Sequence, residues 1–122
     1  MKVFLVEDSI LVRQRLARMI SNIPGIQIVG EALEPRDATR SILETQPEVV
    51  ILDIQLLNGT GMQVLQNIKR AKAPPIVIIL TNFPELRNKY LQAGADFFFD
   101  KSTEFHRIPL TLATMIKLAS KR

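Results

Sequence analysis

The sequence predicts an α/β protein in which a parallel five-stranded sheet is covered by helices on both faces. Five short apolar runs rich in β-branched or aromatic residues recur along the chain, and each is followed by apolar residues at helical spacing. The runs are continuously apolar, which is typical of parallel strands buried on both faces. They cover residues 3–6, 26–29, 49–52, 76–80 and 97–99.

Proline and capping residues place the first three helices between these runs. The first helix is expected to begin near residue 8 or 9 and to end before Pro24. Pro35 suits the first turn of the second helix, which should end before Pro47. Thr60 is a suitable cap for the third helix, because its hydroxyl can accept a backbone N–H at a helix start.

The sequence marks both ends of the fourth helix but not the start of the fifth. Pro84 suits the first turn of the fourth helix, and Gly94 should end it. Apolar residues recur at helical spacing from about residue 103 onward, which predicts the fifth helix. Pro109 leaves the first residue of that helix open, because proline is tolerated only near a helix start.

Length and composition narrow the class of protein. A chain of 122 residues suits one domain, and the absence of cysteine excludes a disulfide framework, a thiolate nucleophile and a cysteine zinc cluster. The cytoplasm is the expected location, because the first six residues are too short for a signal-peptide core. The net charge is +4, but the basic residues are scattered without interleaved aromatic residues. We therefore expect neither direct nucleic-acid contact nor membrane binding.

Polar side chains follow four of the five predicted strands. Glu7 and Asp8 follow the first strand, Asp53 ends the third, Thr81 ends the fourth and Lys101 follows the fifth. In such sheets functional groups collect beyond the carboxyl ends of the strands. Taken singly, Asp8 suits a helix cap and Lys101 a solvated surface charge. Taken together, three acids, a hydroxyl and an ammonium indicate a functional site.

This set of groups predicts phosphoryl-transfer chemistry. Carboxylates are hard oxygen ligands of the kind that Mg²⁺ prefers. Asp53 would attack phosphorus as a carboxylate nucleophile, Lys101 would pair with the phosphoryl oxygens, and Thr81 would donate a hydrogen bond to one of them. The expected product is an aspartyl phosphate.

Other phosphate-handling and hydrolytic sites do not fit the sequence. The first strand-to-helix turn contains Glu7 and Asp8 in place of glycines and would repel a dinucleotide pyrophosphate. The sequence has neither a Gly-Lys-Ser/Thr phosphate loop nor a Gly-x-Ser-x-Gly elbow, and the lone His106 is expected at the surface. A dehalogenase-type phosphatase would carry a second acid two residues after its nucleophile, where this chain has Gln55. We expect a phosphoacceptor and not an enzyme acting on outside substrates.

At these residues the chain resembles the response-regulator receiver family, which has the CheY-like, flavodoxin-like fold. The resemblance covers essentially the whole chain. It implies a doubly wound sheet of strand order 2-1-3-4-5, a single receiver domain over residues 1–122, and a phosphohistidine on a sensor histidine kinase or phosphotransfer protein as the donor. The matching stretches are Val-Glu-Asp-Ser at 6–9, Leu-Asp-Ile-Gln-Leu at 52–56 with Gly61 after it, Leu-Thr-Asn at 80–82, and Ala-Gly-Ala-Asp-Phe-Phe-Phe-Asp-Lys at 93–101.

The resemblance also implies roles for residues around the site. The backbone carbonyl of Gln55 resembles a further Mg²⁺ ligand, and Phe98 resembles the aromatic residue that reorients with Thr81 on activation. An ordinary core position is the alternative for Phe98, which lies in a run of three phenylalanines. Asn82 and Phe83 should flank the phosphoryl group and limit access of water to it. Packing on the fourth helix is the alternative for Phe83.

The sequence departs from the family pattern at four positions. Leu57 stands where proline is common, Asn82 replaces a small residue, and Glu7 in place of aspartate lengthens a ligand arm. Ser102 follows Lys101 where proline is frequent. A cis bond before Ser102 would cost about 3–4 kcal/mol, so we expect either a trans bond or a strained exception.

The resemblance implies that output passes to an unidentified downstream protein through the face formed by the fourth helix, the fifth strand and the fifth helix. Arg87, Lys89 and Tyr90 are candidates for that face, and a phosphorylation-linked dimer is left open. Two alternatives remain: an interaction module that works without phosphorylation, and the receiver of a longer DNA-binding regulator. The complete acidic set argues against the first, and the end at Arg122, if natural, against the second.

Overall fold

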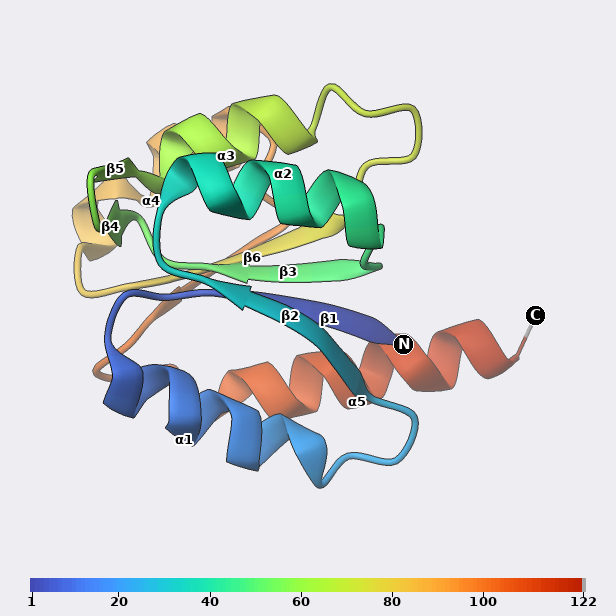
Figure 1. The fold of residues 1–122 in the computed structure, drawn as a ribbon. Helices are drawn as coiled ribbons and strands as arrows, with labels where there is room; N and C mark the ends of the chain where they lie inside the picture. Colours follow the sequence, from blue (N-terminus) through green and yellow to red (C-terminus); the bar gives the residue numbers. More distant parts are fainter. Residues whose placement is uncertain (122) are drawn as a thin grey trace.

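A five-stranded parallel sheet forms the middle of three layers (Figure 1). This computed structural model describes residues 1–121. The sheet order is β2-β1-β3-β6-β7, which confirms the predicted order 2-1-3-4-5 because β4 and β5 lie outside this sheet. The sheet strands are β1 (Lys2–Val6), β2 (Gln27–Ala32), β3 (Val49–Leu52), β6 (Ile76–Thr81) and β7 (Phe97–Asp100).

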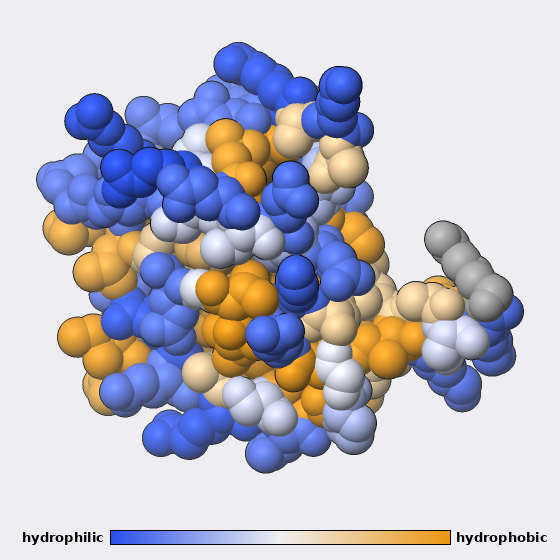
Figure 2. All heavy atoms as spheres, turned by 45° about the vertical axis from the view of Figure 1, so that its right-hand side comes forward, coloured by the Kyte–Doolittle hydropathy of each residue, from blue (hydrophilic) through white to orange (hydrophobic). Residues whose placement is uncertain are grey.

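Helices cover both faces of the sheet. In Figure 1, α1 and α5 lie against one face, and α2, α3 and α4 lie against the other. The last turns of α5 project past the body of the molecule (Figure 2). The helices are α1 (Ile10–Ser21), α2 (Pro35–Thr45), α3 (Gly61–Ile68), α4 (Arg87–Gln92) and α5 (Arg107–Ser120).

Side chains of each sheet strand alternate between two hydrophobic cores. In β3, Val49 and Ile51 belong to the core under α1 and α5, whereas Val50 and Leu52 belong to the core under α2, α3 and α4. All four are almost completely buried. Full burial of one such side chain contributes about 1.5–3 kcal/mol. Burial on both faces explains why the strands are continuously apolar in sequence.

The predicted caps act at two helix starts. The Ser9 hydroxyl accepts a hydrogen bond from the Val12 N–H at 3.3 Å and so caps α1. At the start of α3, the side chain of Gln63 accepts one from the Thr60 N–H at 3.1 Å. Pro35 is the first residue of α2, as predicted.

A small hairpin between β3 and α3 was not predicted. It consists of β4 (Gln55–Leu56) and β5 (Gly59–Thr60), which pair antiparallel. Asn58, in the turn between them, has a positive φ of 60°, a conformation that asparagine tolerates better than most residues. Strands of two residues are too short to produce a periodic pattern in the sequence.

One predicted helix boundary and one predicted strand end were wrong, and one predicted helix has a 3₁₀ first turn that begins at Pro84 as predicted. The fifth helix begins at Arg107 and not near residue 103, and Pro109 is its third residue, where a missing N–H leaves no intrahelical bond unmade. The fourth helix opens as a 3₁₀ turn, η1 (Pro84–Leu86). The second strand continues past residue 29 to Ala32. Gly30 interrupts its apolar run because it packs against the Phe4 ring, where a Cβ atom would come within 2.5 Å of the ring.

Two further observations concern the described chain as a whole. Residues 1–121 contain no cis peptide bond, so the bond between Lys101 and Ser102 is trans. Within the same residues, no helix is both long and apolar enough to cross a membrane.

Candidate functional site

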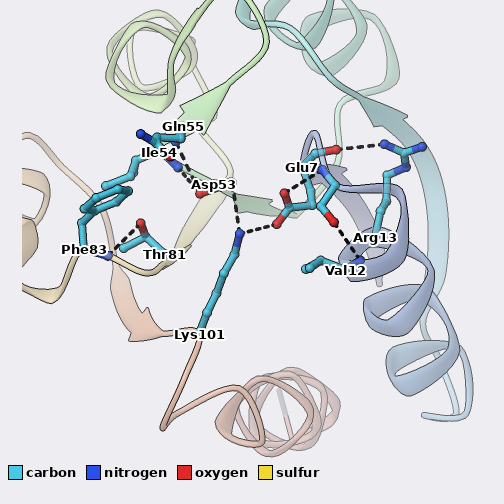
Figure 3. A network of polar contacts seen from close by, with 10 residues as sticks. Glu7, Val12, Arg13, Asp53, Ile54, Gln55, Thr81, Phe83 and Lys101 are labelled. Carbon is cyan, nitrogen blue, oxygen red and sulfur yellow. Dashed lines mark hydrogen bonds and ion pairs between the residues drawn. The ribbon is translucent and has the colours of Figure 1, made fainter.

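Five polar residues lie together at the carboxyl ends of the sheet strands, and four of these residues appear in Figure 3. Glu7 and Asp8 follow β1, Asp53 follows β3, Thr81 ends β6 and Lys101 follows β7. Glu7, Asp53 and Thr81 are at most 5 % exposed, whereas Asp8 is exposed. The parallel strands therefore bring to one edge the residues that the sequence pattern singled out.

Lys101 is the central cation of this edge. Its Nζ lies 2.7 Å from Glu7 Oε1 and 3.1 Å from Asp53 Oδ2, and its side chain is 13 % exposed. Burial alone would lower the pKa of Lys101, but the contact with Glu7 and the charges of Asp53 and Glu7 outweigh it, so the pKa is raised. The reading of Lys101 as a solvated surface charge is wrong, because two carboxylates draw its ammonium inward.

Glu7 is a buried carboxylate that lies between a cation, Lys101, and another acid, Asp53. Burial raises the pKa of Glu7 to about 7, and the charge of Asp53 adds to the rise, while Lys101 and the Ser9 N–H oppose it. The Ser9 N–H donates to Oε2 at 3.0 Å. Oε1 faces the Lys101 ammonium but receives no well-aligned hydrogen bond from the residues described. Oε1 thus has Lys101 as its one charged partner, and its remaining lone pair can bind a cation.

Asp53 is held by the backbone on one side and by Lys101 on the other. Its Oδ1 accepts a hydrogen bond from the Ile54 N–H at 2.7 Å and a longer one from the Gln55 N–H at 3.4 Å. Its own N–H donates to the Val6 carbonyl at 2.9 Å, which ties the end of β3 to β1. Oδ2 remains directed at the Lys101 ammonium (Figure 3).

Gly61 permits α3 to begin directly beside Asp53. A Cβ atom at this position would lie 2.5 Å from the Asp53 carbonyl oxygen, a distance that real Cβ contacts do not reach. The Gly61 N–H donates to the Ile54 carbonyl at 3.0 Å. The glycine that the resemblance picked out is therefore needed for close packing of the segment that carries Asp53.

The acids of this edge form a candidate metal centre. Oxygen atoms of Glu7, Asp8 and Asp53 lie within 4.8 Å of one another. Three carboxylates suit a hard divalent cation such as Mg²⁺, and the Glu7 oxygen without an aligned donor fits the same requirement. The residues present fit a bound Mg²⁺.

Comparison with known proteins decides the family. The family model for the response regulator receiver domain matches residues 3–113. The chain belongs to this family. The structure of the response regulator domain of Thermotoga maritima CheB is 28% identical with a TM-score of 0.83, over 100% of this chain and 97% of that one. The response regulatory domain of mrkE from Klebsiella pneumoniae has the same fold, with a TM-score of 0.89 at 24% identity over 100% of both chains.

Curated relatives are longer than this receiver domain. A protein-glutamate methylesterase/protein-glutamine glutaminase of Hydrogenovibrio crunogenus is 35% identical over 99 residues, which are 81% of this chain and 24% of the relative. The sensory transduction protein LytT of Bacillus cereus is 29% identical over 92% of this chain and 46% of its own length. The chain thus spans less than half the length of these relatives. It is a receiver domain of two-component response regulators.

Thr81 and its neighbours border the receiver site. The Thr81 hydroxyl oxygen accepts a hydrogen bond from the Phe83 N–H at 3.3 Å, and the Lys101 N–H donates to the Thr81 carbonyl at 2.9 Å. Figure 3 shows the hydrogen bond between Phe83 and Thr81. Phe83 is half-buried and packs against the core under α2, α3 and α4, and Asn82 is exposed. The roles assigned to these residues stay predictions.

Phe98 and Tyr90 lie inside the core in this receiver. Phe98 is 2 % exposed, with its ring centroid 6.4 Å from that of Tyr90. The Arg87 guanidinium lies over the Phe98 ring and donates to the Phe98 carbonyl at 2.9 Å. Tyr90 is 4 % exposed, so its placement on an exposed output face was wrong; Arg87 and Lys89 are exposed.

Arg13 is a contributor to the site that sequence reasoning missed. It lies in α1, donates to the Glu7 carbonyl at 2.9 Å, and pairs with Glu31 of β2 at 3.3 Å. Figure 3 shows the contact with Glu7. Arg13 thus fixes the turn that presents Glu7 and Asp8. In the sequence Arg13 is one of several arginines in the predicted helices, and no sequence feature indicates that its side chain points toward the site.

Proposed function

We propose that Asp53 accepts a phosphoryl group in a magnesium-dependent reaction, from a phosphohistidine on a sensor histidine kinase or phosphotransfer protein. The supporting observation is the setting of Asp53, a carboxylate at a buried strand end with Oδ2 facing Lys101 and with Glu7 and Asp8 close by. Such acids are rarely gathered at a buried edge without a cationic partner.

The transfer itself needs few protein groups. A carboxylate oxygen of Asp53 forms the new bond to phosphorus, and the phosphorus–nitrogen bond to the donor imidazole breaks with its electron pair left on nitrogen. Lys101 pairs with a phosphoryl oxygen, because its ammonium already lies within 3.1 Å of Asp53. The Thr81 hydroxyl donates a hydrogen bond to another oxygen. Because the phosphoryl group ends on its own Asp53, this domain acts as a phosphoacceptor and not as a catalyst for outside substrates.

The metal would be held by the carboxylates of Glu7, Asp8 and Asp53 and by the backbone carbonyl of Gln55. When bound, Mg²⁺ supplies positive charge that offsets the charge of the acids and of the phosphoryl oxygens. The Arg13 contact with the Glu7 carbonyl supports this assignment, since it fixes the turn that carries two of the ligands.

Output would pass to a downstream protein through the face of α4, β7 and α5. A groove of about 510 Å³ on this face supports the proposal. Phosphorylation would reorient Thr81 and Phe98 and so change the face, and a phosphorylation-linked dimer is one form that output could take. Residues along the groove are Arg87, Phe97, Phe99, Leu110, Met115 and Leu118.

A second candidate function is that of a receiver attached to its own output domain. The length of the relatives favours it, because this chain matches only 24% and 46% of two of them. A structure of a DNA-binding response regulator from Staphylococcus aureus is also similar, at 28% identity and a TM-score of 0.83. Either candidate would operate in the cytoplasm, where sensor kinases present their phosphohistidine. An antibody against this domain would distinguish the two by the length of the protein in host extracts.

The test of the proposed function is phosphoryl transfer from a panel of the host's histidine kinases. The kinases are first autophosphorylated with radiolabelled ATP and then mixed with the purified protein in Mg²⁺ buffer. We expect rapid transfer from one kinase to a hydroxylamine-sensitive bond that peptide mapping locates at Asp53. Transfer that is independent of Mg²⁺, or a label on another residue, would contradict the proposal.

A further inference from the structure

The backbone on both sides of Lys101 is held by two carboxylates outside the acidic site. The Asp100 N–H donates to Glu104 Oε1 at 3.1 Å, and the Ser102 N–H donates to Asp100 Oδ1 at 2.8 Å. The Lys101 N–H donates to the Thr81 carbonyl at 2.9 Å. Three consecutive backbone N–H groups therefore have fixed acceptors, and two of these acceptors are side chains.

Asp100 and Glu104 form a closed ring. The Glu104 N–H donates to the Asp100 carbonyl at 2.8 Å while the Glu104 carboxylate accepts the Asp100 N–H, so each residue holds the other. Arg107, the first residue of α5, pairs with Glu104 Oε2 at 2.8 Å. The ring thus ties the end of β7 to the start of α5.

The outer side of the same loop is covered from α1. Phe105 is 7 % exposed, and the Arg15 guanidinium lies 4.1 Å from its ring centroid. This contact is a cation–π interaction of the kind that contributes modestly at exposed sites. Together, the ring and this contact limit how far the segment from residue 100 to residue 106 can move.

A fixed backbone matters here because a lysine side chain is long and flexible. Loss of side-chain freedom opposes holding an ammonium in one place, yet Lys101 Nζ contacts both Glu7 and Asp53. Movement of the Lys101 backbone by an ångström or two would take Nζ away from at least one of them. Hydrogen bonds to charged acceptors are among the stronger ones in proteins, which suits them to prevent that movement.

We propose that Asp100 and Glu104 are positioning residues that hold the Lys101 loop, so that the Lys101 ammonium stays between Glu7 and Asp53. The proposal rests on the proposed function for its importance, because Lys101 is the group that would pair with the phosphoryl oxygens. It assigns no contact with the phosphoryl group to Asp100 or Glu104 themselves.

The test measures the reactivity of single lysines in the whole protein. Brief acylation with acetic anhydride, quantified by mass spectrometry, reports how accessible each amine is. In the natural protein, Lys101 should react slowly, because its side chain is 13 % exposed and pairs with two carboxylates. Glu104→Ala should raise the reactivity of Lys101 about tenfold, the change expected when a hydrogen bond to a charged group is lost.

Three controls separate positioning from general loosening. Lys69 is similarly protected, at 20 % exposure and paired with Asp96, and its reactivity should not change. Glu104→Gln keeps an acceptor oxygen and should stay near the natural value. Asp37→Ala removes an i,i+3 ion pair to Arg40 on α2, of the same spacing as that between Glu104 and Arg107, and should have no effect on Lys101.

The outcomes decide the proposal in both directions. A rise confined to Lys101 in Glu104→Ala, restored by Glu104→Gln, supports it. An unchanged Lys101, or an equal rise at Lys69, overturns it. This measurement uses no phosphodonor, so it stands even if the natural protein fails to accept a phosphoryl group on Asp53. In that event the proposed function fails and the positioning of Lys101 is still decided.

Discussion

Two lysine–aspartate pairs lie at opposite edges of the same sheet and differ in how completely their charges are satisfied. At the amino-terminal edge, Lys69 pairs with Asp96 at 2.7 Å and donates to the Pro75 carbonyl, while Asp96 accepts the Val77 N–H. At the carboxyl-terminal edge, Lys101 faces two buried carboxylates, and a third acid lies close. The first pair is balanced and partly exposed, whereas the second leaves excess negative charge in a buried place.

Under the proposed function, the difference is that between a structural ion pair and a functional one. Lys69 and Asp96 hold the loop before β6 to the start of β7, and every partner they need is present. Lys101 carries one positive charge among the three acids Glu7, Asp8 and Asp53. Burial raises the pKa of Glu7 to about 7, and the charge of Asp53 adds to the rise. An excess of buried charge costs stability and is retained where a cation or a reacting group will meet it.

The largest expected effect comes from the aspartates of the two pairs. Asp53→Asn should abolish hydroxylamine-sensitive labelling by a kinase or a small phosphodonor in Mg²⁺, because an amide oxygen is not a nucleophile for this transfer. Asp96→Asn should be labelled normally and should instead lower the free energy of unfolding by about 1–3 kcal/mol, the cost of weakening a hydrogen-bonded ion pair. Radiolabel incorporation and urea unfolding measure the two effects. Undiminished formation of an acyl phosphate on the Asp53→Asn variant would refute Asp53 as the phosphoacceptor.

Substitutions of Lys101 and Lys69 should also differ in their effect on the response to phosphorylation. Lys101→Met should remove most of the phosphorylation-dependent change in the protein, followed as a shift in the NMR spectrum on addition of a phosphodonor. In saturating Mg²⁺ its free energy of unfolding should fall by less than about 1 kcal/mol, because the metal supplies positive charge among the same acids. Lys69→Met is the matched control and should respond to the phosphodonor as the natural protein does. A normal response of Lys101→Met would make Lys101 a structural residue like Lys69.

Removal of Asp8 should weaken Mg²⁺ binding without unfolding the protein. Asp8 is exposed, so its side chain contributes little to the core, but it supplies one of three clustered carboxylates. We expect Asp8→Ala to raise the dissociation constant for Mg²⁺ by more than about tenfold, or 1.4 kcal/mol. Isothermal titration of the unphosphorylated protein measures this, with Asp37→Ala as an exposed control. Equal affinities in the two variants would refute the ligand set.

Much of the fold and of the candidate site could be predicted from the sequence, and the reasons are physical. Parallel strands buried on both faces must be continuously apolar, so the parallel sheet and the edge that carries Glu7, Asp53 and Lys101 followed from the pattern, whereas the strand order came from the family resemblance. The directions of long side chains did not follow, because a lysine or arginine can reach any of several partners. Lys101 was therefore taken singly as a possible surface charge, and the role of Arg13 was missed.

Local hydrogen bonds account for the boundaries that the sequence misplaced. The ring between Asp100 and Glu104 holds residues 101–106 in turns, so α5 starts at Arg107 although helical spacing of apolar residues begins earlier. Tyr90 was named as a candidate for the output face that the resemblance implies; packing against Phe98 buries it. The start of α5 and the burial of Tyr90 depend on contacts in the folded protein that a single sequence does not display.

The smallest expected effect concerns the lifetime of the phosphorylated state and tests whether Phe83 limits access of water to the phosphoryl group. Hydrolysis of an aspartyl phosphate requires a water molecule in line with the bond from Asp53 to phosphorus. The Phe83 N–H donates to the Thr81 hydroxyl, which places Phe83 next to the site, and its ring offers no hydrogen bond to such a water. Phe83→Glu should therefore shorten the lifetime about tenfold, or 1.4 kcal/mol in the barrier, with Mg²⁺ affinity nearly unchanged.

Packing is the competing role for Phe83, since its side chain also contacts the core under α2, α3 and α4. Phe83→Leu is the matched control, because leucine keeps an apolar surface and cannot orient water. If exclusion of water is the role, the phosphorylated Leu variant should decay nearly as slowly as the natural protein, while the Glu variant decays faster at similar stability. If both variants lose stability while the decay rate of the aspartyl phosphate is unchanged, Phe83 has a packing role alone. Other residues would then determine the lifetime of the aspartyl phosphate.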